Sequence, residues 1–390
     1  MTTFMGYERP DGSVGVRNHL LVLTPMDCSI EPAKKIAAQV GGVAVTQTYG
    51  CGYDSMIVEN LVGTALNPNV GAVLIVGLGC ETLTGDILME KIEHSGKPVE
   101  NITIQELGGT LKTHVKGVRI LQRMKQEMAE MKREAFPLSK LTLAVECGGS
   151  DATSGLAANP AVGAAADMVI EEGGTVIFGE TQEMTGTQHI LAKRAINQKV
   201  AQDIEKIIQD QMNRQRAMGV DSRWMSKGNI DGGLTTIEEK SLGAIVKGGT
   251  KQVRGVLFNN WERFDKPEVP GLYLMDGPGW DVPSVTHMVA AGAQIVCFTT
   301  GRGSTTGHAI APVIKITGNP ATYRNMGDNM DIDASTILDG SESLVGVGNR
   351  IFESILRTAN GWQSKAEALG YEDFIVFKRS REAERLLGHC

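Results

Sequence analysis

The sequence has no excess of positive charge and no long apolar run. Among its 390 residues, 38 Lys and Arg stand against 45 Asp and Glu, which gives a net charge of −7. Nucleic acids and anionic membranes bind basic surfaces, so we expect neither as a partner. No window approaches about eighteen uninterrupted apolar residues, and the start lacks the basic and apolar regions of a signal peptide. These absences together predict a cytoplasmic protein.

Cysteine is scarce as well. Six cysteines at irregular spacings, none in a Cys-x-x-Cys pair, do not match the framework of a secreted disulfide-rich protein. Reduced thiols are therefore expected. Four of them border predicted turns, namely Cys28, Cys51, Cys80 and Cys147. Two interpretations stay open for these four: a small buried side chain, or a ligand of iron.

Two common catalytic signatures are also missing. No Gly-x-Ser-x-Gly elbow occurs, which disfavours an α/β-hydrolase triad, and no Gly-x-Gly-x-x-Gly fingerprint follows an apolar strand, which disfavours a nucleotide-dependent oxidoreductase. The composition itself is that of a folded protein, with 42% apolar and 21% charged residues, and 47 glycines that show no repeat. A chain of this length is expected to form two domains.

Short apolar runs alternate with helix-length segments along the chain, which is typical of parallel α/β layers. We predict a smaller α/β domain over residues 1–136, whose last helix, Ile120–Phe136, ends at Pro137. In the second domain, residues 137–390, we predict one long helix over Gln188–Met218 and a loop over Ser226–Gly233. The predicted strands are Leu20–Leu23, Val43–Val45, Val73–Val76, Ile102–Ile104, Leu141–Val145, Val176–Phe178, Val256–Phe258, Leu272–Met275, Ile295–Phe298 and Val313–Ile316.

Three of these strands lead straight into polar, glycine-rich turns, at residues 146–151, 179–183 and 299–304. Because the carboxyl ends of parallel strands share one edge of a sheet, where ligands bind, the three turns are expected to meet. They would bring together a thiol, three carboxylates and an arginine, here Cys147, Asp151, Glu180, Glu183 and Arg302. Such a set suits a divalent metal and a small anionic substrate.

Glu180 and Glu183 are spaced so that one helical turn would place both on the same face. Paired carboxylates of this kind bind Mg²⁺, Mn²⁺ or Fe²⁺, and a thiolate from Cys147 beside them would favour iron. The alternative is that one of the two only interacts with a helix N-terminus.

Arg302 lies among hydroxyls and glycines in the Thr299–Ser304 turn. A guanidinium in that setting suits bidentate recognition of a substrate carboxylate, with a structural ion pair as the alternative. The histidines, among them His189, are weak candidates because none has the spacing of a metal-binding motif. In the segment Thr235–Lys240, a Thr-x-x-Glu pattern indicates that Glu238 or Glu239 caps a helix.

Longer motifs are spread over nearly the whole chain: Asp11–Asn18, Thr48–Cys51, Asn67–Val73, Gly77–Glu81, Glu146–Asp151, Ser154–Pro160, Gly179–Glu183, Gly232–Gly243, Thr299–Ser304 and Asp331–Asp333. Together they resemble the altronate/galactarate dehydratase family, whose relatives include the large subunit of sulfolactate sulfo-lyase. The resemblance implies a lyase that removes water, or sulfite in the sulfolactate branch, from a small hydroxy acid. A divalent metal assists, typically Fe²⁺, with Mn²⁺ or Mg²⁺ as alternatives.

The resemblance also implies an architecture. It comprises a Rossmann-like parallel sheet in the C-terminal domain and, before it, a smaller α/β domain that forms a homodimer. The sugar-acid dehydratases carry a further small β-rich domain, of the SAF type, ahead of the part matched here. Since the match starts directly at Gly6 and Tyr7, we expect either a separate small subunit that supplies this domain or an enzyme that works without it.

The resemblance and the turn motifs together give a set of expected roles. Lys240 or His189 would be the base that removes the α-proton, and Arg302 would stabilise the anion formed. The expected metal ligands are Cys147, Glu180 and Glu183, and the expected substrate-binding residues are Arg302, Ser304, Ser150, Asp151 and Asn159.

The two branches of the family match different parts of the sequence. Cys51, Cys80 and the Thr300–Ser304 loop resemble the dehydratases, whereas Phe178–Thr181 and Lys227–Ile230 resemble the sulfo-lyase side. We favour a hydro-lyase of carbohydrate acid catabolism that removes water from an altronate- or galactarate-like acid to give a 2-keto-3-deoxy acid. The alternatives are the large subunit of sulfolactate sulfo-lyase, releasing sulfite and pyruvate, and a non-catalytic subunit that binds a sugar acid or serves as a scaffold.

Overall fold

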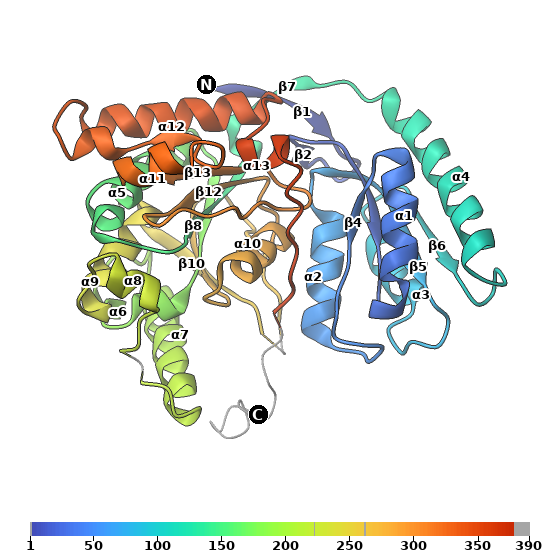
Figure 1. Ribbon diagram of the computed structural model, residues 1–390, viewed down its shortest axis with the longest axis horizontal. Coiled ribbons are helices and arrows are strands. Elements are labelled where there is room, and N and C mark those ends of the chain that lie inside the picture. Colours follow the sequence, from blue (N-terminus) through green and yellow to red (C-terminus); the bar gives the residue numbers. More distant parts are fainter. Residues whose placement is uncertain (1, 222, 261–262, 378–390) are drawn as a thin grey trace.

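Two parallel sheets covered by helices make up most of the structure, a computed structural model that describes residues 2–221, 223–260 and 263–377 (Figure 1). A four-stranded sheet comes first in the chain and a seven-stranded sheet follows, and a three-stranded antiparallel sheet completes the molecule. The predicted class, an α/β fold with a larger parallel sheet preceded by a smaller α/β unit, is confirmed. The division at residue 136 stays a prediction, and residues 378–390 of the predicted second domain lie outside the described residues.

The first parallel sheet has the order β4-β3-β5-β6 and is covered on both faces. Its central strand β5 is buried along its whole length, as expected for a parallel strand between two helix layers. Apolar side chains of α1 and α4 pack on one face, and those of α2 and α3 pack on the face toward the second sheet. The elements are β3 (His19–Leu23), η1 (Asp27–Ser29), α1 (Ile30–Val40), β4 (Val43–Val45), α2 (Ser55–Leu66), β5 (Val70–Gly77), α3 (Gly85–Glu93), β6 (Val99–Thr103) and α4 (Thr110–Ala129).

The connection between the two units differs from the sequence prediction. The predicted helix Ile120–Phe136 is wrong at both ends, because α4 begins at Thr110 and ends at Ala129. Residues Glu134–Pro137 instead form strand β7, which pairs antiparallel with β1 (Thr3–Glu8), while β2 (Val14–Gly15) pairs on the other side of β1. Pro137 therefore ends a strand rather than a helix.

The second parallel sheet has the order β10-β11-β9-β8-β12-β13-β14. Strand β8 lies between β9 and β12, so the chain turns to one side of β8 first and to the other side later. The strands are β8 (Thr142–Cys147), β9 (Thr175–Phe178), β10 (Val253–Phe258), β11 (Leu272–Asp276), β12 (Ile295–Thr299), β13 (Val313–Thr317) and β14 (Ile332–Asp333). Ligands bind at such a reversal, outside the carboxyl ends of the strands.

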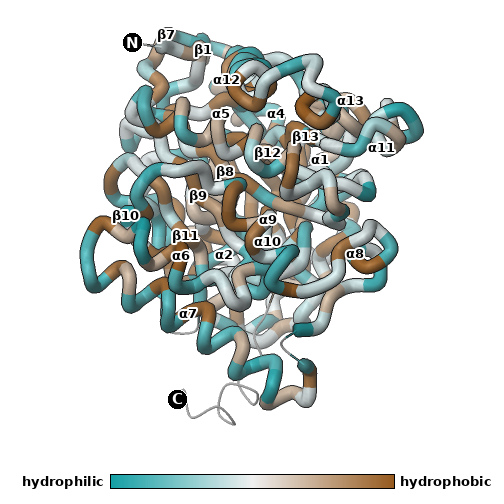
Figure 2. Tube along the Cα trace, turned by 90° about the vertical axis from the view of Figure 1, so that its left-hand side faces the viewer, coloured by the Kyte–Doolittle hydropathy of each residue, from teal (hydrophilic) through white to brown (hydrophobic). Residues whose placement is uncertain are grey.

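Helices cover both faces of this sheet, and the tube in Figure 2 shows apolar strands inside and polar stretches on outer helices such as α7. Helices α5, α7 and α12 pack on one face, whereas α10 packs on the other face and against α2 of the first unit. The helical elements are η2 (Leu138–Lys140), η3 (Ser154–Ala158), α5 (Asn159–Glu171), η4 (Thr181–Met184), α6 (Gln188–Ala192), α7 (Gln198–Ala217), α8 (Lys227–Asp231), α9 (Ile237–Ile245), η5 (Val246–Gly248), α10 (Asp281–Ala290), α11 (Pro320–Asn325), η6 (Ser335–Ile337), α12 (Leu344–Ala359) and α13 (Lys365–Ala368).

Two further predictions were wrong in detail. The single helix predicted over Gln188–Met218 is two helices, α6 and α7, and the predicted loop Ser226–Gly233 contains the short helix α8, capped by the side chain of Ser226. Within the described part of the chain, no helix combines the length and apolar character needed to cross a bilayer.

Candidate functional site

The loops after β8 and β12 cross each other at the point where the strand order reverses. The backbone N–H groups of Gly301 and Arg302 both donate to the carbonyl oxygen of Gly149, at 2.9 and 3.0 Å. The crossing needs glycine, because a Cβ atom on Gly301 would lie 2.2 Å from Cγ of Asp151. These contacts bring together two of the three predicted turns.

Buried ion pairs lie directly behind this crossing. Nζ of Lys247, in η5, lies 2.5 Å from Oε2 of Glu180, and both side chains are almost completely buried. Nζ of Lys240, in α9, lies 2.5 Å from Oε1 of Glu183. The third turn therefore meets the lysines of the segment 237–248. Glu180 precedes η4 and has a left-handed backbone, so the two glutamates do not share one helical turn as their spacing predicted, although Lys247 lies near both.

Glu180 has an unusual backbone conformation. Its φ of 71° is positive, and it is the one non-glycine residue with positive φ in the described ranges. A left-handed conformation costs an ordinary residue about 1–2 kcal/mol, so strong contacts must hold it in place. The Lys247 ion pair does so, and Cys147 N donates to Glu180 Oε2 at 3.2 Å. Strain of this kind is concentrated at functional sites.

A group of three buried or half-buried carboxyls could hold a metal ion. Oxygen atoms of Glu146, Glu180 and Asp281 all lie within 4.8 Å of one another. Ser284 donates to Glu146 Oε2 at 2.8 Å, while Glu146 Oε1 is buried without a hydrogen-bond partner among the described residues. Burial, and next the charge of Glu180, raise the pKa of Glu146 well above its usual range. These carboxyls are therefore crowded together in a way that a bound cation would relieve.

The charge balance of the cluster points the same way. Four carboxyl groups, those of Glu146, Glu180, Glu183 and Asp281, interact with only two ammonium groups, those of Lys240 and Lys247. If all are ionised, two negative charges remain in a buried region, where unpaired charge is strongly unfavourable. A divalent cation would neutralise them, so the donor set fits a hard or intermediate divalent metal.

Both lysines are held in their charged form. Burial alone would lower the pKa of Lys240, but the carboxylate of Glu183 and then the thiol of Cys147 outweigh it, and the net pKa is raised. The pKa of Lys247 is raised as well, because Glu180 and Glu183 outweigh its burial. The cluster thus supplies two fixed positive charges at neutral pH.

A cavity of about 290 Å³ opens on the Lys240 side of the cluster. Ser150, Asp151, Asn159 and Lys240 line it, together with apolar residues of η3 and α9. Lys240 Nζ donates to Ser150 Oγ at 2.9 Å. Cys147 Sγ lies just behind, 3.3 Å from Ser150 Oγ and 3.4 Å from the Asn159 amide nitrogen.

Asp151 has a local structural role in addition. Its Oδ1 accepts from the backbone N–H groups of Thr153 and Ser154, and its Oδ2 accepts from the Asn319 side chain at 2.7 Å. These bonds fix the turn at the start of η3 and attach it to the loop after β13.

Three predicted site residues lie apart from the buried cluster. Arg302 is exposed beside Gly149, where a Cβ on Gly149 would lie 3.3 Å from Cβ of Arg302. Ser304 is half-buried and bonded to Thr306 at 2.8 Å. His189 is exposed on α6. Their roles stay predictions, as do the metal-binding roles of Cys147 and Glu183, which are not members of the three-carboxyl group.

Sequence reasoning missed Glu146 as a site residue, and it missed Lys247, Asp281 and Ser284 entirely. Glu146 is a charged residue inside an otherwise apolar strand, and Asp281 follows the polar turn after β11, so both carried a signal. Lys247 and Ser284 carried none, because a lysine and a serine in helical segments are ordinary. Glu239, by contrast, contacts Thr235 and its N–H is bonded to Thr236, the N-cap of α9, which agrees with the capping interpretation.

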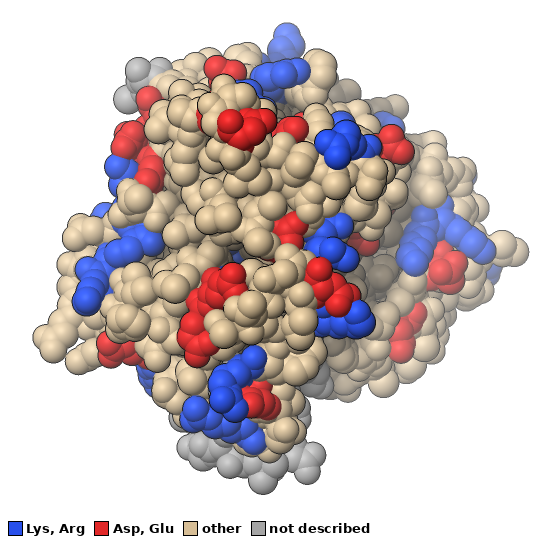
Figure 3. Space-filling view, turned by 60° about the vertical axis from the view of Figure 1, so that its left-hand side comes forward, with Lys and Arg blue, Asp and Glu red and all other residues tan. Residues whose placement is uncertain are grey.

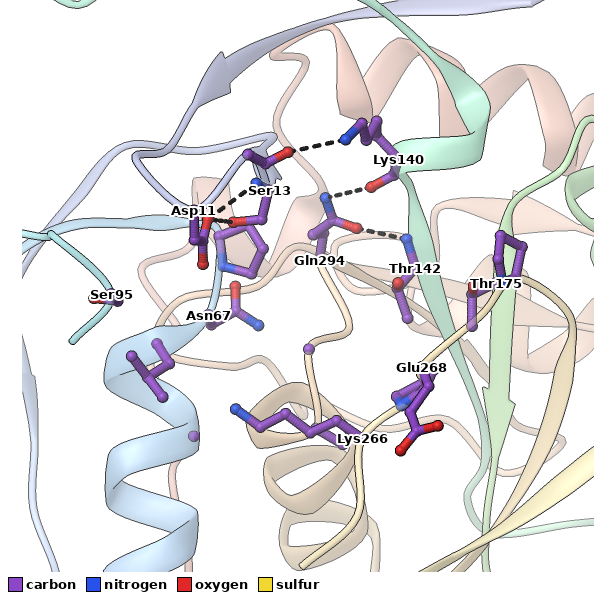
Figure 4. Close-up of a pocket in the computed structure, with 18 of the residues that line it drawn as sticks. Asp11, Ser13, Asn67, Ser95, Lys140, Thr142, Thr175, Lys266, Glu268 and Gln294 are labelled. Carbon is purple, nitrogen blue, oxygen red and sulfur yellow. Dashed lines mark hydrogen bonds between the residues drawn. The ribbon is translucent and has the colours of Figure 1, made fainter. Parts of the chain in front are cut away.

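A larger cavity, of about 740 Å³, lies at the opposite edge of the sheet. It is lined by the starts of β8 and β9, at Thr142 and Thr175, and by Lys266 and Asp11 from the surrounding loops (Figure 4). Gln294 fixes this region by bonding the backbone of Thr142 and Lys140. The buried carboxyls paired with lysines, Glu180 with Lys247 and Glu183 with Lys240, are at the other edge, so chemistry assigns the site there despite the smaller cavity.

The face of the molecule drawn in Figure 3 carries charges of both signs. On the face in Figure 3, Lys and Arg side chains alternate with Asp and Glu, and most of the surface between them is uncharged.

Comparison with known protein families covers almost the whole chain. Residues 138–382 match the model for the C-terminal part of D-galactarate/altronate dehydratase, and residues 6–129 match the second domain of D-galactarate dehydratase/altronate hydrolase. The chain belongs to the galactarate/altronate dehydratase family. The buried cluster and its cavity lie within the C-terminal part of this family's fold.

Individual members of the family show how the chain relates to each branch. It is 38% identical to the (2R)-sulfolactate sulfo-lyase subunit beta of Chromohalobacter salexigens, over 96% of this chain and 97% of that protein. It is 34% identical to galactarate dehydratase (L-threo-forming) of Escherichia coli, over 92% of this chain and 73% of that protein. It is 31% identical to altronate dehydratase of Bacillus subtilis, over 96% of this chain and 78% of that protein.

Proposed function

We propose that this chain is the large subunit of a lyase that releases sulfite from a small 3-sulfo-2-hydroxy acid such as sulfolactate. The observation that supports this most is the 38% identity to the sulfo-lyase subunit beta, which exceeds the 31% and 34% identity to the two dehydratases. The comparison thus favours the alternative of the sequence analysis over its preferred reading. Because the relative is named as one subunit, we also propose a second, separate subunit. The homodimer stays a prediction.

Dehydration of a sugar acid is the second candidate. Both family models carry dehydratase names, and the alignments with the dehydratases also span nearly all of this chain. The two reactions share the removal of an α-proton and the loss of a group from the next carbon. One site can therefore serve either, and the leaving group is what separates them.

The shared chemistry requires fixed positive charge. A proton α to an ionised carboxylate is very weakly acidic, because its removal leaves a second negative charge on the same few atoms. Preorganised cations stabilise that charge as it develops. Lys240, on the cavity wall, is suited to this role, with Lys247 behind it. A divalent metal held by Glu146, Glu180 and Asp281 would add Lewis-acid polarisation of a substrate oxygen.

The ion pair between Lys240 and Glu183 favours Glu183 as the base, in place of Lys240 or His189. Lys240 can accept a proton only when neutral, and its raised pKa keeps it protonated. Glu183 is the better acceptor, because burial and then the charge of Glu180 raise its pKa above its usual range, and because it contacts Lys240 of the cavity wall. Its Oε2 has no hydrogen-bond partner among the described residues.

The proposed reaction begins at C2 of the substrate. Glu183 takes the proton from C2, the C–H electron pair forms a C2–C3 double bond, and the C3–S bond breaks with its electrons leaving on sulfite. The resulting enol takes a proton at C3, for which Lys240 is placed on the cavity wall, gives up the proton of its C2 hydroxyl to solvent, and becomes pyruvate. In the dehydration alternative the C3–O bond breaks and the departing hydroxide takes a proton to leave as water.

The test is a substrate screen with the purified chain, with and without a co-expressed small subunit, under reducing conditions with added Fe²⁺. Sulfolactate, altronate and galactarate are supplied separately, and sulfite and semicarbazide-trapped 2-oxo acid are both measured. Equal amounts of sulfite and 2-oxo acid from sulfolactate support the proposal. A 2-oxo acid from altronate or galactarate alone supports the dehydratase. Binding without any product in every combination supports the non-catalytic subunit.

A further inference from the structure

Three cysteines of the first unit follow three neighbouring parallel strands. In the order β4-β3-β5, Cys51 follows β4, Cys28 follows β3 and Cys80 follows β5. Neighbouring strands lie about 4.8 Å apart, and the carboxyl ends of parallel strands share one edge. The topology therefore places all three cysteines at the same edge of the small sheet, and none is part of the buried carboxylate cluster.

Hydrogen bonds tie the three loops to one another. Thr82 N donates to the carbonyl oxygen of Cys51 at 2.9 Å, which joins the loop after β5 to the loop after β4. The Gln47 side chain donates to Pro25 O at 2.6 Å and Gly50 O at 2.9 Å, which joins the loops after β3 and β4. The Glu81 carboxylate accepts from the N–H groups of residues 78, 79 and 80 and so shapes the turn that carries Cys80.

All three thiols are exposed and free of disulfide bonds. The pKa of Cys28 is raised, by slight desolvation first, then by Asp27, and also by the neighbouring Cys80 and Cys51, so both other sulfurs lie within electrostatic range. Three exposed thiols close together are unusual for a structural role, since cysteine in a protein is normally among the most buried residues.

The distances between the three sulfurs distinguish a site for a single metal ion from a site for an iron–sulfur cluster. A single tetrahedral ion with bonds of 2.3 Å to sulfur would need the sulfurs about 3.8 Å apart. Among the described residues, the three sulfurs do not form a group whose members all lie within 4.8 Å. A polynuclear iron–sulfur cluster holds its cysteine sulfurs farther apart than a single ion does, and thiolates are the ligands that such clusters prefer.

We infer that Cys28, Cys51 and Cys80 bind a four-iron, four-sulfide cluster at the carboxyl edge of the β4-β3-β5 sheet. Three thiolates leave one iron without a cysteine ligand, free to take an oxygen of a small molecule or a nearby carboxylate.

The position of this edge relative to the carboxylate cluster adds to the inference. Helix α2 begins just after Cys51, α10 begins at Asp281, and the two helices lie next to each other (Figure 1). Their far ends are in contact, since Asn67 donates to the carbonyl oxygen of Val289 at 2.8 Å. Both helices therefore run toward the same end of the interface, and Cys51 and Asp281 lie at or near their starts, at the other end.

The experiment is purification of the full chain without oxygen, reconstitution with Fe²⁺ and sulfide, and measurement of iron, acid-labile sulfide and visible absorption. About four sulfide per chain are expected, with four iron in the cluster and one more iron where the carboxylate group is also loaded. Iron without sulfide, or neither after reconstitution, would overturn the inference. The readout does not depend on turnover, so it is separate from the proposed reaction.

Variants locate the cluster. Cys28→Ala, Cys51→Ala and Cys80→Ala each are expected to lose most of the sulfide and of the visible absorption, and because the three residues are exposed these variants should fold normally. Cys297→Ala, in β12, removes a thiol elsewhere and should keep both signals. Glu180→Gln, in the carboxylate cluster, should keep the sulfide as well. Retention of full sulfide by all three cysteine variants would contradict the assignment.

Discussion

At the scale of single residues, Glu180 has the conformation least expected of its type. Its positive φ predicts that Glu180→Gly is more stable than Glu180→Ala by about 1 kcal/mol, because only glycine adopts this region without a penalty. At Glu183, inside η4, the order should be reversed, since glycine loses more entropy there. Each pair lacks the carboxylate in both members, so the charge effect cancels. Urea unfolding measures both differences, and the same order at both positions would contradict the prediction.

The carboxylate of Glu180 can be tested separately from its backbone. Glu180→Gln keeps the shape but leaves Lys247 without its closest partner, so we expect a loss of stability of about 3 kcal/mol or more. Bound metal and turnover should both fall at least about tenfold. Metal analysis and rate are measured beside Glu238→Gln, an exposed carboxyl on α9 that should match the parent. Unchanged metal content and rate would end the proposed role of Glu180.

Site residues were predictable where they sat on a turn after a strand. Glu180, Glu183, Cys147 and Lys240 were named from the sequence and lie together, although their roles stay predictions. Lys247 could not be found this way, because nothing local marks a lysine that will be buried against a carboxylate from 67 residues earlier. Pairing across the fold decides its role, and a single sequence does not show that pairing.

At the scale of elements, the break between α6 and α7 shows why a helical pattern overran its real boundary. Ile196 N donates to Val253 O and Val253 N donates to Arg194 O, so the segment 194–196 pairs with the start of β10. The helix resumes at Gln198 with Asn197 as its N-cap, whose side chain accepts from Val200 N at 3.0 Å. The charged, helix-favouring composition of 188–218 predicted one continuous helix, because composition does not show that residues 194–196 pair with β10.

That cap gives a prediction for α7. Asn197→Ala is expected to reduce the free energy of unfolding by about 1 kcal/mol, because it leaves an N–H group at the helix start without its partner. Asn197→Asp, which keeps an acceptor oxygen, should remain close to the parent. Denaturant unfolding of the three proteins gives the comparison, and equal losses in both variants would show that the cap contributes nothing.

Most strands of the two parallel sheets were predicted, because most are short apolar runs; the two-residue strand β14 was missed, and the prediction for β6 overlaps it only at Ile102 and Thr103. The antiparallel sheet was not, because β1 pairs with β7 across most of the first unit, with Phe4 opposite Phe136. A hairpin turn would have signalled such a pair, and here no turn joins the strands. A local sequence pattern does not predict a short strand whose pairing partner lies far away in the chain.

At the scale of the whole molecule, one buried histidine near the contact between the two units makes stability depend on pH. His308 follows β12 in the second unit, and burial, then the charge of His19 on β3, lower its pKa to about 3. Its Nδ1 accepts from Ile310 N at 3.2 Å, which requires the neutral ring. An unfolded histidine has a pKa near 6.5, so below that pH the unfolded chain binds a proton that the folded chain does not.

Stability should therefore be complete above about pH 6.5 and fall as the pH drops toward 3, with a slope from this residue of about 1.4 kcal/mol per pH unit. His308→Gln removes the contribution of this histidine to the pH dependence. The variant should therefore lose about 2 kcal/mol less free energy of unfolding between pH 7 and pH 5 than the parent does. His114→Gln, on the exposed surface of α4, should follow the parent. Urea unfolding at the two pH values measures this difference. An equal pH dependence in His308→Gln and the parent would mean that other groups control the acid sensitivity of the molecule.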